Sequence, residues 1–110
     1  MTVNELKDRF KLKVLAGSNN LNREVNGFYS CDLLSWVLGK AKSGNALLTV
    51  MGNINSIAVA AMLDLSCIIL TEGSWLDEDA KQKANEEGIP VLASEVGTFE
   101  LTKLICSEIL

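Results

Sequence analysis

One stretch of the chain constrains its fold more than any other, the segment from Ala46 to Ser74 that reads ALLTVMGNINSIAVAAMLDLSCIILTEGS. It predicts a strand, a glycine turn, an apolar helix and a second strand. Nearly every residue from Ile54 to Leu65 is small or apolar, so this helix has no wide polar face. Such a helix must be covered on more than one side. We expect the cover to be the sheet together with either other helices or a second copy of the chain.

The rest of the chain continues this alternation. We expect strands over residues 13–16, 24–30, 46–51, 67–70 and 90–93, with helices up to about residue 10, over 33–41, after 53, over 77–87 and from 98 to the end. Strands and helices that alternate at this pitch predict right-handed crossovers and a mainly parallel sheet. The sequence therefore predicts an α/β fold, a single three-layer-like domain over residues 1–110 with about five short strands and flanking helices.

Helix starts are marked by residues that can cap them. Thr2 and Glu5 have the spacing of a capping box. Ser30 or Asp32 can cap the helix over 33–41, and Asn53 can cap the apolar helix.

Composition and charge narrow the classes of protein. A chain of 110 residues that is 48% hydrophobic can bury a core without disulfides. Its net charge of −4, with the Lys and Arg residues scattered, argues against a nucleic-acid partner. The apolar runs are too short and interrupted to span a membrane, and because the polar start MTVNELKDRF has no apolar stretch, we expect no secretion signal. Three cysteines without a metal-type spacing suit a reducing compartment, so we expect a cytoplasmic protein.

Several catalytic chemistries lack the residues that they need. The chain contains no histidine, which removes histidine bases, Ser-His-Asp triads and most zinc sites. Neither a GxxxxGK[ST] phosphate loop nor a GxGxxG turn occurs. We therefore expect a protein that is not an enzyme and that has no metal site and no cofactor.

A ligand site is most reasonably sought beyond the carboxyl ends of the strands, where open α/β sheets bind their ligands. The candidate ligand-binding residues are the small and polar ones at these ends: Cys31, Asp32, Gly52, Asn53, Asn55, Thr71, Glu72 and Gly73. Backbone N–H groups at the following helix N-termini could hold a nucleotide or another anion. The alternative is that these residues are ordinary caps and turns.

Two of the cysteines require separate consideration. A thiol at a helix N-terminus can become a reactive thiolate. Next to Cys31, however, Asp32 favours the neutral thiol and no lysine is adjacent, so we expect Cys31 to be unreactive. Cys67 lies within a predicted buried strand and is expected in the core.

The chain from about Leu21 to Ser94 resembles the DRTGG domain, through the predicted strand–helix–strand segment and its neighbours LNREVNGFYSCDLLSWVLGKAKSGNALLTV and EEGIPVLAS. The similarity is greatest to small stand-alone members, loosely described as HPr serine kinase-like. The family name comes from an Asp-Arg pair before the central helix and a Thr-Gly-Gly after the next strand. The matching positions here are Asn53-Ile54 and Thr71-Glu72-Gly73, so the Asp-Arg charge pair is absent and only Thr71 and Gly73 are kept.

The resemblance implies a fold similar to the N-terminal domain of HPr kinase/phosphorylase, without the separate catalytic domain. Because DRTGG domains also accompany CBS domains and phosphotransacetylase, it implies a non-catalytic regulatory or protein-interaction module. Some stand-alone members are encoded near iron-only hydrogenase genes, which implies a link to hydrogenase or energy metabolism. Together with the apolar helix, these implications lead us to expect a homodimer, and they leave a further protein partner open. The second hypothesis is a small-ligand sensor that binds a nucleotide or anion at the carboxyl ends of the strands.

Overall fold

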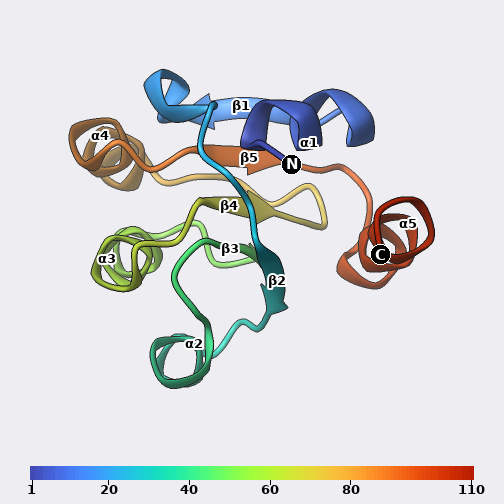
Figure 1. The fold of residues 1–110 in the computed structure, drawn as a ribbon. Coiled ribbons are helices and arrows are strands. Elements are labelled where there is room, and N and C mark those ends of the chain that lie inside the picture. Colours follow the sequence, from blue (N-terminus) through green and yellow to red (C-terminus); the bar gives the residue numbers. More distant parts are fainter.

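A five-stranded sheet organises the computed structural model, which describes residues 1–110 (Figure 1). The strands are β1 (Lys13–Ala16), β2 (Gly27–Ser30), β3 (Asn45–Thr49), β4 (Cys67–Leu70) and β5 (Val91–Ala93). They lie in the order β1-β5-β4-β3-β2. The strands from β2 to β5 pair in parallel, and β1 joins β5 antiparallel. The predicted α/β class with a mainly parallel sheet is confirmed.

Helices cover both faces of this sheet. They are α1 (Val3–Phe10), α2 (Leu34–Lys40), α3 (Ile54–Leu63), α4 (Glu78–Glu87) and α5 (Thr98–Glu108), with a short 3₁₀ turn at Ser18–Asn20. Figure 1 shows α2, α3 and α4 on one face and α1 and α5 on the other. No helix among them has the length and apolar character needed to traverse a bilayer.

The central strands β3 and β4 are buried on both faces. On β3, Leu47 belongs to the core beneath α2, α3 and α4, while Leu48 belongs to the core beneath α1 and α5. Every residue of β4 is buried, as expected for a strand inside a parallel sheet. Burial raises the pKa of the Cys67 thiol on this strand to about 12, so the thiol stays protonated and acts as core.

The expected strand over 24–30 is shorter in the structure because its first residues pair with the N-terminus. Glu24 forms an isolated bridge with Thr2, and the Val25 N–H donates to the carbonyl of Met1. Only from Gly27 onward does the chain run beside β3. The capping box of Thr2 and Glu5 is present as predicted and begins α1 beside this bridge.

Helix α3 is covered by the sheet and lies beside α2 and α4 (Figure 1). Ile57 and Ala60 are fully buried against the sheet. The side that faces away from the sheet stays open, with Met62 at 72% exposure and Ile54 at 40%. The predicted cover by other helices is therefore present, and within one chain it leaves an apolar outer side.

A candidate ligand pocket at the carboxyl edge of the sheet

Two loops meet where β3 and β4 end. Because these strands are parallel neighbours, the chain that follows each of them emerges at the same edge of the sheet. The Asp77 N–H donates to the carbonyl of Gly52 at 2.8 Å and so ties the loops together. A Cβ atom on Gly52 would overlap the carbonyl oxygen of Trp75. Glycine at position 52 therefore permits the close approach of the two loops.

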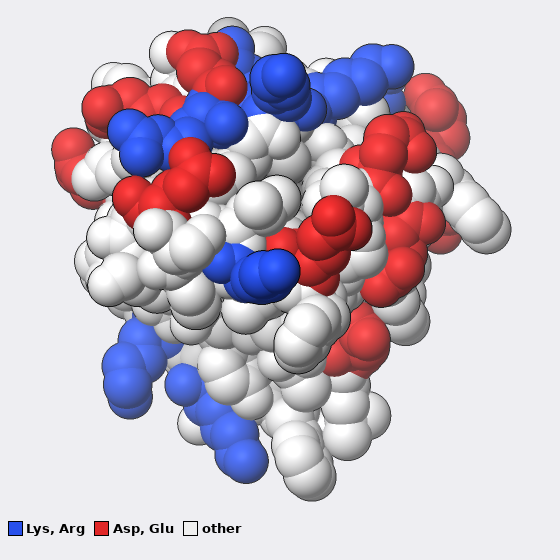
Figure 2. Space-filling model, turned by 90° about the vertical axis from the view of Figure 1, so that its right-hand side faces the viewer, with Lys and Arg blue, Asp and Glu red and all other residues white.

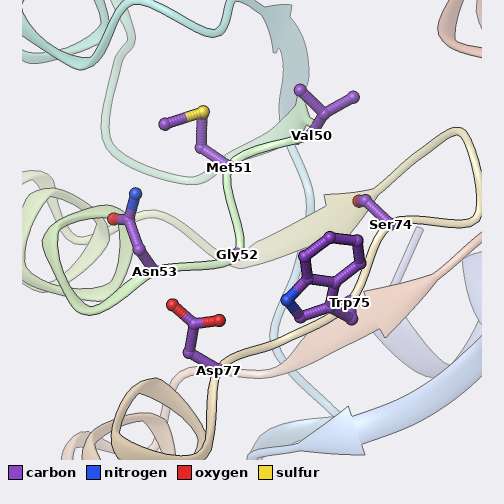
Figure 3. Close-up of a pocket in the computed structure, with 7 residues that line it drawn as sticks. All are labelled: Val50, Met51, Gly52, Asn53, Ser74, Trp75 and Asp77. Carbon is purple, nitrogen blue, oxygen red and sulfur yellow. The ribbon is translucent and has the colours of Figure 1, made fainter.

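The two loops enclose a pocket of about 170 Å³. Its lining residues are Val50, Met51, Gly52, Asn53, Ser74, Trp75 and Asp77 (Figure 3). A pocket for a drug-sized ligand has a volume of roughly 300 to 1,000 Å³. The pocket here therefore suits one ring or a short chain, and a larger ligand would extend from it into solvent.

Three lining residues, Ser74, Trp75 and Asp77, have side chains that the rest of the fold leaves exposed or without hydrogen-bond partners. The indole of Trp75 is part of the lining, yet this residue is 76% exposed. The Ser74 hydroxyl is buried and has no hydrogen-bond partner. Asp77 is the N-cap residue of α4, but its carboxylate accepts no capping hydrogen bond. In Figure 3 this carboxylate points toward the turn formed by Gly52 and Asn53.

The N-termini of α3 and α4 both border the pocket, because their N-cap residues Asn53 and Asp77 line it. The Asn53 side chain accepts a hydrogen bond from the Ser56 N–H at 3.1 Å, as its predicted role as a cap requires. Helix N-termini carry partial positive charge. The only charged side chain in the lining is the Asp77 carboxylate, which sits near both helix starts.

Asp32 holds the chain at the end of β3, where the lining residue Val50 begins the loop that borders the pocket. Its Oδ1 atom accepts hydrogen bonds from the Thr49 hydroxyl and from the Val50 N–H, both at 2.9 Å. Asp32 therefore fixes the chain where it leaves β3. The expectation that Ser30 or Asp32 caps α2 is wrong, because the N-cap residue is Leu33 and no side chain caps that helix.

Thr71 and Glu72 serve the start of α5 on the other face of the sheet. The Thr71 and Thr98 hydroxyls are 2.6 Å apart, and the Glu72 carboxylate accepts from the Thr98 N–H at 2.9 Å. Glu72 and Gly73 have left-handed backbone conformations, with φ of 63° and 64°. This turn, which occupies the Thr-Gly-Gly position of the resemblance, holds α5 in place and does not line the pocket.

The remaining two candidates lie apart from the pocket. Asn55 is exposed in the first turn of α3 and is not part of the lining. The Cys31 thiol lies 3.7 Å from the carbonyl of Leu33, ahead of α2. Of the eight residues proposed from the sequence, the structure brings Gly52 and Asn53 to the pocket. No three His, Cys, Asp or Glu side chains gather where they could hold a metal ion.

Besides Val50 and Met51 after β3, sequence reasoning missed three lining residues that follow β4: Ser74, Trp75 and Asp77. Their position after β4 was a usable signal, because the same rule that selected Thr71 to Gly73 extends to the whole loop before α4. The burial of the Ser74 hydroxyl had no signal in the sequence, since it depends on how this loop packs against the loop after β3.

Comparison with known proteins gives a family and a fold. The family model of the DRTGG domain matches residues 5–107. A solved structure of the CBS and DRTGG domains from the regulatory region of Clostridium perfringens pyrophosphatase, complexed with its activator diadenosine tetraphosphate, is similar at a TM-score of 0.74 and 13% identity. The similarity covers 94% of this chain and 45% of the solved chain, so this chain spans less than half the length of that regulatory-region structure. No curated protein matches the sequence.

Proposed function

The chain belongs to the DRTGG domain family, and we propose that it is a non-catalytic regulatory module that acts through protein interaction, as a homodimer. The observation that carries this proposal is the outer surface of α2 and α3, which is apolar and exposed. Five of the nine large apolar side chains that are exposed lie there: Leu33, Trp36, Leu38, Ile54 and Met62. Apolar side chains that gather on a surface are typical of protein–protein contacts.

Charge favours a second copy of the chain as the occupant of this surface. A two-fold dimer brings the same surface of each subunit together. A charged side chain near the symmetry axis therefore lies close to the same charge on the other subunit and is repelled by it. Helix α3 contains no charged residue between Ile54 and Leu63. By contrast, α4 carries four acidic residues, and Figure 2 shows charges of both signs over the face formed by α1 and α5. Helix α3 can therefore meet its copy without such repulsion, and the one charged side chain of α2, Lys40, lies over the Trp36 ring at 4.5 Å.

The test is the oligomeric state of a variant with a charge on α3. Met62→Glu introduces like charges on both sides of the proposed interface, and Met62 is exposed enough for the subunit to stay folded. We expect a dimer for the wild type and a monomer for Met62→Glu in sedimentation equilibrium. Phe99→Glu, at an even more exposed apolar position on α5, is the matched control and should remain a dimer. A monomeric wild type, or a dimeric folded Met62→Glu, would contradict the proposal. Ala60 is unsuitable for this test because it is fully buried.

A second candidate function is a small-ligand sensor for a nucleotide or anion, and the unpartnered Ser74 hydroxyl in the pocket favours it. In this proposal Gly52 and Asn53 contact the ligand, while Asp32 holds the start of their loop through its hydrogen bond with the Val50 N–H. A ligand at one hundred times its dissociation constant stabilises the folded state by about 2.7 kcal/mol. In a domain of this size the unfolding midpoint would rise by roughly 10 °C or more. A panel of nucleotides, phosphorylated metabolites and anions that leaves the midpoint unchanged would count against a sensor.

The proposal of a regulatory module also includes where the protein acts in the cell. The family resemblance leads us to propose a cytoplasmic module linked to hydrogenase or energy metabolism. Deletion of its gene should then lower hydrogenase activity in cell extracts, and reintroduction of the wild-type gene should restore it. Unchanged hydrogenase activity in the deletion strain would contradict this link.

A further inference from the structure

We infer that the pocket between the loops after β3 and β4 binds the edge of a flat, uncharged nitrogen heterocycle that carries an amino group, the chemistry of an amino nucleobase. The inference rests on the ligand-sensor candidate above and narrows its ligand class. It assigns recognition to Ser74, Trp75 and Asp77, which line the pocket together (Figure 3).

The first support for this inference is the flat surface that Trp75 offers. Its indole ring lies in the pocket beside Gly52 while the residue remains 76% exposed. An exposed aromatic face stacks on a base of any identity, because every base has a π-face. The pocket volume of about 170 Å³ also suits a single ring system better than a complete nucleotide.

The second support is a pair of polar groups at opposite sides of the indole. Figure 3 shows Ser74 on one side of the Trp75 ring and Asp77 on the other. An ionised carboxylate only accepts hydrogen bonds, whereas a serine hydroxyl can also donate one. A heterocycle stacked on Trp75 would meet Asp77 with an amino group and Ser74 with a ring nitrogen. This arrangement would satisfy the buried hydroxyl that has no partner in the fold.

The charges near the pocket disfavour other ligand classes. A phosphate would meet the Asp77 carboxylate without any lysine or arginine in the lining. A guanidinium group is positively charged and would be repelled by the partial positive charge at the N-termini of α3 and α4. It also has five donors and no acceptor, so the proton of the Ser74 hydroxyl would stay unpaired. An uncharged ring with both a donor and an acceptor avoids both problems.

The test measures Trp75 fluorescence in a Trp36→Phe background, where Trp75 is the remaining tryptophan. The protein is titrated with adenosine and guanosine, and with purine riboside, which has the same rings but no amino group. We expect saturable quenching by at least one of the amino nucleosides, with about tenfold or more weaker binding of purine riboside, since hydrogen bonds to a charged group are the stronger kind.

Variants separate Asp77 from its neighbours on α4. Asp77→Ala should weaken nucleoside binding about tenfold or more, and Ser74→Ala should weaken it by a smaller factor. The matched control is Asp79→Ala, which removes the same charge from the first turn of α4 outside the lining and should leave binding unchanged. Equal nucleoside affinity of Asp77→Ala and the Trp36→Phe parent would overturn the inference.

Two further titrations distinguish failure of this inference from failure of the sensor candidate. Saturable binding of inorganic phosphate or agmatine, with no response to the nucleosides, would overturn the ligand class and retain a ligand site. No response to any of these probes, in protein that unfolds cooperatively on heating, would overturn both.

Discussion

Two groups of polar side chains share the carboxyl edge of the sheet, and they differ in what their hydrogen bonds serve. Asp32, Thr71 and Glu72 each bond to a neighbouring segment of the fold. Ser74 has no partner, and Asp77 leaves its helix without a side-chain cap. The first group holds the loops and α5 in position, and the second has capacity left for a ligand. Position beside a strand end is therefore a weaker guide to a binding site than unused bonding capacity.

The largest expected effect concerns Gly52, where the two loops touch. In Gly52→Ala the new methyl group would overlap the Trp75 carbonyl, so one loop must move. We expect a loss of about 3 kcal/mol in the free energy of unfolding, which lowers the thermal midpoint by roughly 15 °C. Thermal unfolding followed by circular dichroism measures this change. Gly39→Ala is the matched control, because its added Cβ would meet no atom within 4 Å other than those of its chain neighbours and its own helix backbone. A midpoint for Gly52→Ala equal to that of this control would contradict the close contact of the loops.

The second prediction compares the two aspartates directly. Asp32→Ala removes the acceptor of the Thr49 hydroxyl, which is fully buried. It should lower the free energy of unfolding by about 2 kcal/mol. Asp77→Ala removes no side-chain cap and should change this free energy by about 0.5 kcal/mol or less. Urea unfolding of both variants is the measurement. Equal destabilisation by the two substitutions would remove the distinction between the two groups.

The third prediction concerns the hydroxyl pair that joins β4 to α5. Thr71→Val leaves the Thr98 hydroxyl without its partner and should cost about 1 kcal/mol of unfolding free energy. Replacing both threonines by valine should cost less than the sum of the single variants, because no unpaired hydroxyl remains. A double-mutant cycle in urea provides the coupling energy. Strict additivity of the two substitutions would show that the hydroxyls do not interact.

The smallest expected effect belongs to Ser74→Ala. Because its hydroxyl is buried without a partner, replacing it by hydrogen removes a desolvation cost and no hydrogen bond. We expect the free energy of unfolding to stay the same or rise by about 0.5 kcal/mol. A clear loss of stability in urea unfolding would mean that Ser74 belongs with Asp32 and Thr71.

Much of the fold was predictable from the sequence, since apolar runs and turn residues locate β3, β4 and α3. The pairing of β1 antiparallel to β5 was not predicted, because its partner lies far away along the chain. The pairing of Glu24, at the start of the expected strand over 24–30, with Thr2 near the N-terminus was not predicted either.

The candidate site was predictable only in part, and the reason is long-range contact. Gly52 and Asn53 follow a recognisable buried strand, so the rule for α/β sheets finds them. Thr71 follows a similar strand, yet its partner is Thr98, 27 residues away. A sequence shows which polar residues follow a strand, whereas the contacts that use or spare their hydrogen bonds arise from packing between distant segments.

The central claim is that Asp77 is available to a ligand while Asp32 is committed to the fold. The most direct test is thermal unfolding of the wild type, Asp32→Asn and Asp77→Ala, each with and without saturating adenosine or guanosine. We predict that one of these nucleosides raises the midpoint of the wild type and of Asp32→Asn, but not that of Asp77→Ala. A nucleoside shift that persists in Asp77→Ala and disappears in Asp32→Asn would contradict the account.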